Sequence, residues 1–265
     1  MKSRRAKSSA RREGQGKRIA LARALSKLGC CSRSEAFSLI REGRVRLNGT
    51  LPRNPETPVR LGIDRIEVDG KQACAAARVY LMLNKPRGMV TTAHDEKGRE
   101  AIYSLLPSDR PWIAPVGRLD KASEGLLLLT NDSEWGARIT DPHSHLEKTY
   151  HVQIGAVADS KLLESLERGV EMPNGERLKA KRAGLIRSGE RNSWIEIVLD
   201  EGKNRQIRRM LNGFGFEVLR LVRVAIGPLQ LGDLAKGAFR SLRQEEKAAL
   251  DRAIANSSPP RSPLP

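Results

Sequence analysis

The residues best placed to do chemistry lie in a short loop bracketed by glycines. The sequence GRLDKASEG at residues 117–125 is followed at once by the apolar run 126–129. A buried strand that begins beside such a loop can hold one carboxylate, Asp120, rigidly at the edge of a sheet. A carboxylate held in this way can act as a nucleophile or a general base. An isolated loop aspartate more often caps a turn, so the residue types alone leave both interpretations of Asp120 open.

A second group of candidates lies in a basic run that contains Lys203, Arg205 and Arg208. Because Arg205 and Arg208 are three residues apart, they share one face of a helix, and one of them can reach a neighbouring site. The alternative is a solvated basic helix face. Tyr150 lies in an expected strand, where it either packs in the core or offers its ring to a nucleic-acid base.

The charge of the chain indicates the kind of partner. Its 265 residues include 48 Lys and Arg against 31 Asp and Glu, a net charge of +17 with a pI near 10.3. Residues 1–70 carry 17 basic and 7 acidic side chains, a net of +10. A positive field of this size attracts polyanions and favours nucleic acid as the partner. We expect the N-terminal quarter to be the main docking surface.

Several classes of site are disfavoured. The three cysteines, Cys30, Cys31 and Cys74, show neither a zinc-binding spacing nor a disulfide framework. His143 and His145 could share a metal only with further ligands, so we expect no metal and no cofactor. The apolar runs are too short to cross a bilayer, and no secretory signal opens the chain. We therefore expect a soluble, cytoplasmic protein that works as a monomer.

The first part of the chain predicts a small domain behind a basic arm. Residues 1–17 lack apolar periodicity and predict a disordered arm, with an organelle transit peptide as the alternative. Residues 18–70 predict two helices and a hairpin. The sequence SRSE at 32–35 is a capping box, and RVRLNG at 44–49 predicts a strand that enters an Asn-Gly turn. The Ala-rich residues 71–78 predict a linker.

Residues 79–255 predict a second, larger domain. Its β-type stretches are 79–83, 149–154, 194–199 and 218–224. Its helical patterns are 134–139, 160–168, 206–214 and 244–254. Such mixing is typical of an α+β domain with a largely antiparallel sheet. The Ser- and Pro-rich residues 256–265 predict a disordered tail.

Both parts resemble known families. The first resembles the alpha-L RNA-binding module of a ribosomal protein and many RNA-modifying enzymes, on the stretches SRSEA at 32–36 and GRVRLNG at 43–49. The loop at 117–125 resembles the signature of the pseudouridine synthases, in the ribosomal-RNA branch typified by the small-subunit enzyme. The other matching stretches are LNKPRG at 83–88, EKTY at 147–150, EGKNRQIRRM at 201–210 and RVAIGPL at 223–229. They occur in the family's order between residue 79 and about residue 245.

The resemblance implies an activity and roles for three residues. It implies that Asp120 attacks a uridine during cleavage of the N-glycosidic bond, after which the uracil is rotated and rejoined to the ribose through carbon. It gives Tyr150 the role of stacking on the target base, and Arg208 the role of pairing with the Asp120 carboxylate. It implies no metal and no cofactor, and a target nucleotide taken out of its stack. Whether the aspartate adds first to the sugar or to the base stays open.

Basic residues in or beside the matching stretches are candidates for contacts with RNA, although each is as often an ordinary solvated charge. In the larger domain they are Lys85, Arg87, Arg118, Lys203 and Arg205, and in the N-terminal module Arg33, Arg44 and Arg46.

The modified nucleotide is not determined by the sequence. The chain departs from many relatives at Ser133, where they have glycine, and at the stretch HSH at 143–145, where they carry a basic residue. The expected partner is structured RNA: ribosomal RNA, of the large subunit or alternatively the small one, or an assembly intermediate of a subunit. The same chemistry on transfer RNA is a rival hypothesis, and a non-catalytic ribosome-assembly protein is another. A DNA-binding regulator would explain the charge but none of the motifs.

Overall fold

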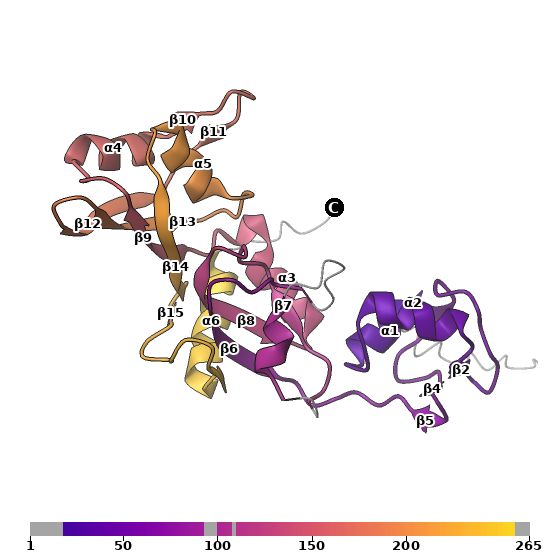
Figure 1. The fold of residues 1–265 in the computed structure, drawn as a ribbon. Helices are drawn as coiled ribbons and strands as arrows, with labels where there is room; N and C mark the ends of the chain where they lie inside the picture. The colour runs from indigo at the N-terminus through magenta and orange to yellow at the C-terminus, as the bar shows by residue number, and fades with distance from the viewer. Residues whose placement is uncertain (1–17, 93–99, 108–109, 258–265) are drawn as a thin grey trace, which may run out of the picture. The chain divides into compact units, whose positions relative to one another are not determined.

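The computed structural model describes residues 18–92, 100–107 and 110–257, and the chain divides into two compact units, residues 1–76 and 77–265 (Figure 1). The predicted basic arm, 1–17, and all but two residues of the predicted tail lie outside the described residues. Within the described ranges, no helix combines the length and apolar character that a membrane span requires.

The first unit contains two helices and short strands. They are β1 (Ile19–Ala20), α1 (Leu21–Lys27), α2 (Arg33–Arg41), β2 (Val45–Leu47), β3 (Pro58–Val59), β4 (Ile66–Val68) and β5 (Lys71–Gln72). As the capping box predicts, the Ser32 hydroxyl accepts a hydrogen bond of 3.0 Å from the Glu35 N–H at the start of α2. Leu21, Leu25 and Ile40 are fully buried between the helices and the small sheets.

The predicted hairpin differs from the observed pairing. Asn48 and Gly49 do form a turn, with φ of 50° and 83°. The turn closes only the pair Leu47 and Thr50, whose backbones exchange hydrogen bonds of 2.8 and 2.9 Å. The sheet partner of β2 is the more distant β4, which in turn pairs with β5.

The predicted linker begins too early. Residues 71 and 72 form β5, the Ala73 N–H donates to the Ile66 carbonyl, and the Ala76 N–H donates to the Leu28 carbonyl. These hydrogen bonds keep the chain within the first unit as far as Ala76, because burying the backbone beside α1 and β4 requires them.

The second unit contains a nine-stranded sheet. The order is β12-β13-β9-β14-β8-β6-β16, with β15 paired to β14 and β7 paired to β8. The strands are β6 (Tyr80–Lys85), β7 (Ala114–Val116), β8 (Glu124–Thr130), β9 (Lys148–Ile154), β12 (Arg182–Ser188), β13 (Ser193–Leu199), β14 (Val218–Ile226), β15 (Leu229–Gln230) and β16 (Phe239–Ser241). All neighbours are antiparallel except β14 and β8, which run parallel. A separate hairpin pairs β10 (Val170–Glu171) with β11 (Arg177–Leu178).

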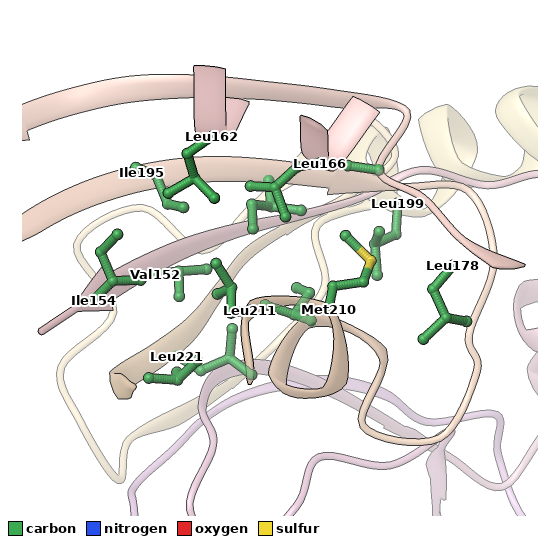
Figure 2. Packing of buried hydrophobic residues seen from close by; sticks show 14 of the residues in the cluster. Val152, Ile154, Leu162, Leu166, Leu178, Ile195, Leu199, Met210, Leu211 and Leu221 are labelled. Carbon is green, nitrogen blue, oxygen red and sulfur yellow. The ribbon is translucent and has the colours of Figure 1, made fainter. Parts of the chain in front are cut away.

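Helices and two short 3-10 turns complete the second unit. They are η1 (Ile102–Leu105), α3 (Ser133–Thr140), η2 (Pro142–Ser144), α4 (Ser160–Arg168), α5 (Gln206–Gly213) and α6 (Gln244–Ser257). α6 therefore continues into the first two residues of the predicted tail. The side chains of α4 and α5 pack with those of β9, β13 and β14 in one hydrophobic core, in which Figure 2 shows Leu166 and Met210 beside strand residues such as Val152.

The leucine run of β8 is buried on both faces. Leu126 and Leu128 pack in a cluster with residues of α3 and α6, whereas Leu127 and Leu129 pack in a second cluster with residues of β6 and η1. Successive strand residues face opposite sides of a sheet, so an unbroken apolar run requires cover on both sides. The loop that precedes β8 is thereby anchored to the most buried strand of the unit.

Candidate active site

The loop with Asp120 joins β7 to β8 and is shaped by glycine at both ends. Gly117 has φ of 73° and Gly125 has φ of 100°, a region that residues with a Cβ avoid. A Cβ on Gly125 would lie 2.3 Å from the carbonyl oxygen of Arg223, the residue paired with it on β14. Glycine is thus required at 125 because the two backbones approach so closely, and this approach fixes the loop against β14.

Lys85 is part of this loop's support and does not face solvent. Its side chain is fully buried, and its ammonium donates hydrogen bonds to the carbonyl oxygens of Pro86 at 3.0 Å, Asp120 at 3.2 Å and Ser123 at 2.8 Å. Burial lowers the pKa of Lys85 to about 8, against the opposing charges of Asp120 and Glu124. Its three donors are thus already used inside the fold, which leaves none for the RNA contact that the sequence predicted.

Two further contacts hold the loop on the same side. The Thr91 hydroxyl donates to the Leu119 carbonyl at 2.8 Å and accepts from the Leu119 N–H at 3.3 Å. The Gly88 N–H donates to the Lys121 carbonyl at 2.8 Å. The backbone on either side of Asp120 is therefore tied to the segment that follows β6, while the Asp120 side chain stays 38% exposed.

Among the residues that the structure describes, Arg205 forms the ion pair with the Asp120 carboxylate. Its Nη1 lies 3.5 Å from the Asp120 Oδ2. Arg205 precedes α5 and adopts φ of 48°, a left-handed conformation that is uncommon for a residue with a side chain. The sequence predicted that either Arg205 or Arg208 reaches a neighbouring site, and the resemblance favoured Arg208 as the carboxylate's partner. The structure gives the ion pair to Arg205.

Arg208 supports the loop through its backbone. Its Nη2 donates to the Ala122 carbonyl at 3.0 Å and its Nη1 donates to the Val218 carbonyl at 3.2 Å. Burial and the neighbouring Arg205 lower the pKa of the Arg208 guanidinium, and the Asp120 carboxylate opposes this shift. Arg208 thus lies within the electrostatic influence of Asp120 and braces its loop without forming the predicted side-chain pair.

Asp120 opens onto a cleft of about 600 Å³. Tyr150 of β9 is half-buried, contacts two hydrophobic cores and lines this cleft together with Asp120. The exposed residues Arg118, Lys203 and Arg205 also line it. The cleft therefore combines one carboxylate, one aromatic ring and a cationic rim, an arrangement suited to a nucleotide with a charged backbone.

Lys203 and Arg87, two further predicted RNA contacts, are both exposed, but they have different partners within the fold. Lys203 forms ion pairs with Glu201 and Glu176, at 3.2 and 3.7 Å, and Arg87 donates to the Leu219 carbonyl at 3.2 Å. Both side chains are held at the surface by these contacts. Neither contact excludes a phosphate, because each side chain keeps other donors.

The three predicted RNA contacts of the first unit, Arg33, Arg44 and Arg46, differ in how far the fold already engages their charge. Arg44 is bound to Asp69 by two hydrogen bonds of 2.9 and 2.7 Å, so its charge is largely compensated within the fold. Arg33 and Arg46 are exposed, and Arg46 donates to the Gly49 carbonyl at 3.3 Å. Arg33 and Arg46 are therefore more available than Arg44 for a polyanion.

Sequence reasoning missed three residues that line or support the cleft. Thr91 follows the stretch at 83–88 and had no visible signal. Lys148 and Arg223 lie inside the matching stretches at 147–150 and 223–229, yet no role followed from their residue types. Lys148 and Arg223 both line the cleft, and the pairing of β9 with β14 brings these two residues together.

Comparisons with known proteins match both units. Residues 79–213 match the family model described as RNA pseudouridylate synthase, and residues 21–63 match the model of the S4 domain. Over 238 residues the chain is 38% identical to an uncharacterized RNA pseudouridine synthase of Aquifex aeolicus (strain VF5), covering 89% of this chain and 95% of that relative.

Two other similar proteins are informative. The ribosomal large subunit pseudouridine synthase B of Bacillus subtilis (strain 168) is 36% identical over 237 residues, covering 89% of this chain and 96% of the relative. A crystal structure of a pseudouridylate synthase matches with a TM-score of 0.62 and 29% identity, over 88% of this chain and 99% of that chain. The matched S4 domain and this structural similarity confirm the predicted α+β fold class.

Proposed function

Because this chain belongs to the RNA pseudouridine synthase family and carries an S4 domain, we propose that it converts one uridine of large-subunit ribosomal RNA to pseudouridine. In this isomerisation the bond between C1′ and N1 of the nucleotide breaks, the uracil turns, and C5 bonds to C1′ in its place. The relative from Bacillus subtilis, named for the large ribosomal subunit, favours this RNA.

We propose Asp120 as the nucleophile, and the observation that carries this is the way its loop is built. Lys85 and Arg208 hold the loop's carbonyl groups, yet the carboxylate itself is exposed to the cleft and contacts Arg205 at 3.5 Å. Holding a reactive group in place before the substrate arrives lowers the entropic barrier to reaction. A flipped-out uridine that enters the cleft meets this carboxylate beside Tyr150, whose ring is suited to stack on the base.

RNA binding is divided between the two units in this proposal. The exposed Arg33 and Arg46 of the S4 domain contact phosphates of the RNA, and Arg118, Lys203 and Arg87 contact phosphates beside the target nucleotide. Such contacts position the RNA without reading its bases.

The test compares Asp120→Asn with Asp233→Asn, an exposed aspartate outside the cleft. Each protein is incubated with transcripts of large-subunit, small-subunit and transfer RNA, and pseudouridines are mapped chemically. We expect Asp233→Asn and wild type to modify one position of the large-subunit RNA, and Asp120→Asn to bind this RNA normally without modifying it. Turnover by Asp120→Asn within tenfold of wild type would exclude Asp120 as the nucleophile. Modification of another RNA alone would reassign the substrate.

A further inference from the structure

Two cations that line the cleft have no role in the function proposed so far. Arg223 of β14 stands directly opposite Tyr150 in the pairing of β14 with β9, and Lys148 lies two residues before Tyr150 on β9. Directly opposed residues of paired strands, and residues two apart on one strand, share a face of the sheet. Arg223, Lys148 and Tyr150 accordingly line the same cleft as Asp120.

Arg223 is fixed in place but its terminal donors are unused. The residue is 6% exposed, and its Nε donates to the Leu126 carbonyl at 2.7 Å. Neither Nη1 nor Nη2 forms a hydrogen bond with any residue in the described part of the chain, and Nη2 is shielded from solvent. A buried N–H donor without an acceptor is unfavourable unless a ligand supplies one. The backbone of Arg223 is held between two strands, paired with Gly125 of β8 and with Tyr150 of β9.

Lys148 adds a second cation that has no close ion pair among the described residues. Its ammonium has no hydrogen bond or ion pair within 4.0 Å among the residues that the structure describes. Burial and the charge of Arg223 lower the pKa of Lys148, and the charge of Asp200 opposes them. The cleft's own carboxylates are engaged elsewhere, Asp120 with Arg205 and Glu201 with Lys203. Two neighbouring cations with no anion between them favour binding of a negatively charged ligand.

We propose that Arg223 and Lys148 bind the carbonyl oxygens of the detached uracil ring and stabilise its negative charge, an inference that rests on the proposed function. When the C1′–N1 bond breaks, its electron pair stays with the ring, and the charge spreads over N1, O2 and O4. Bonding of C5 to C1′ then releases the C5 proton, and N1 gains a proton, so the product is an isomer of the substrate. Donors placed where charge develops are among the largest contributions to catalysis.

The position of the pair favours the base over a backbone phosphate. Arg223 is more than nine-tenths buried and directly beside Tyr150, the residue proposed to stack on the base. A phosphate within RNA carries a ribose on each side and is therefore better accommodated by the exposed cations of the rim, Arg118 and Lys203.

The experiment uses Lys148→Met in the full chain, with Lys161→Met as the matched control, because Lys161 is an exposed lysine of α4 outside the cleft. Single-turnover rates and RNA dissociation constants are measured across a salt series. We expect Lys148→Met to slow conversion on the order of 100-fold. Its RNA affinity and salt dependence should match those of the control, and Lys148→Arg should recover most of the rate. Arg223→Gln is measured beside them if circular dichroism shows that it folds.

A second substrate separates charge stabilisation from a structural defect. RNA with 5-fluorouridine at the target position releases a ring anion that fluorine already stabilises, and its consumption is followed by mass spectrometry of the digested RNA. The defect of Lys148→Met should be several-fold smaller on this RNA than on uridine.

Three results would overturn the inference. One is an equal defect of Lys148→Met on both substrates. Another is an unchanged rate at saturation together with a salt slope reduced by about 0.7–0.9, which indicates a phosphate ligand. The third is behaviour identical to Lys161→Met. Each leaves the proposed function intact if wild type converts uridine, whereas a wild-type protein that forms no pseudouridine in any RNA refutes both.

Discussion

Replacement of Lys85 by methionine removes the donor that ties the end of β6 to the loop of Asp120. Three carbonyl oxygens, those of Pro86, Asp120 and Ser123, lose their hydrogen bonds to the ammonium. The Asp120 carbonyl keeps a hydrogen bond of 2.9 Å from the Ser123 N–H, so two of the three acceptors lose a donor that is not replaced. Each buried acceptor left without a donor costs about 1–3 kcal/mol, or about 2–6 kcal/mol for the two. The change also relieves the burial of an ammonium whose pKa is lowered from 10.5 to about 8, which corresponds to roughly 3 kcal/mol. The balance, about 2–6 kcal/mol less roughly 3 kcal/mol, is a destabilisation of up to about 3 kcal/mol.

The assay measures both stability and chemistry. For a unit of this size a loss of up to about 3 kcal/mol lowers the melting temperature by up to about 12 °C. Lys181→Met is the control, because Lys181 is an exposed lysine in a surface ion pair with Glu147, worth less than about 1 kcal/mol. Below the melting range, Lys85→Met should convert uridine more slowly, because the nucleophile's backbone is no longer fixed.

RNA affinity distinguishes this role from the one predicted from sequence. If Lys85 supports the loop, the salt dependence of RNA binding is unchanged in Lys85→Met. If Lys85 contacts a phosphate, the slope of log affinity against log salt falls by about 0.7–0.9. A variant with wild-type stability, wild-type conversion rate and a reduced slope would refute the loop-support assignment.

Two further predictions concern stability. Gly125→Ala should destabilise the protein by more than about 3 kcal/mol, since its Cβ would meet the Arg223 carbonyl at 2.3 Å, whereas Gly184→Ala, with nothing within 4 Å, should change stability by less than about 1 kcal/mol in a urea titration. Hydrogen bonds from Arg240 lower the pKa of Glu246 to about 2. The ionised Glu246 therefore stabilises the fold by about 2 kcal/mol after allowance for solvent screening. This stabilisation is present above the unfolded pKa near 4.5 and is lost as pH falls toward 2. As pH falls over that range, the difference in the free energy of unfolding between wild type and Glu246→Gln should narrow. A difference that stays constant would contradict a lowered pKa of Glu246 in the folded protein.

Sequence patterns predicted the elements whose burial has a clear period. α4 begins and ends where its pattern predicts, at Ser160 and Arg168, and the Asp159 side chain caps it. The leucine run of β8 has the apolar continuity of a strand buried on both faces. By contrast β12 (Arg182–Ser188) has no buried residue, and Leu185 and Ile186 are exposed, so neither alternation nor an apolar run marks it as a strand. Pairing with β13 alone defines it.

Only the residues of the site that lie in local sequence motifs were predictable. Asp120 and Tyr150 lie in stretches whose residues carry a recognisable pattern, and both line the cleft. Lys85 was predicted as an RNA contact and Arg208 as the partner of the Asp120 carboxylate, whereas both donate to carbonyl groups of the Asp120 loop that lie 35 and 86 residues away in the chain. No local pattern reports whether a lysine after a strand turns inward, since that depends on which carbonyl groups the tertiary fold leaves unpaired.

The contacts around Asp120 differ in strength in a way that suits a nucleophile. Its backbone is held by buried or half-buried donors at 3.2 Å or less, from Lys85 and, through Ala122, from Arg208. Within the described ranges its carboxylate has one ion pair, at 3.5 Å, with a half-exposed Arg205. An exposed pair at that distance contributes less than about 1 kcal/mol, so an incoming nucleotide can displace it at little cost. Removal of a backbone contact misplaces the carboxylate, whereas removal of Arg205 changes mainly its charge environment. Arg205→Lys should therefore retain the fold and stability that Lys85→Met loses.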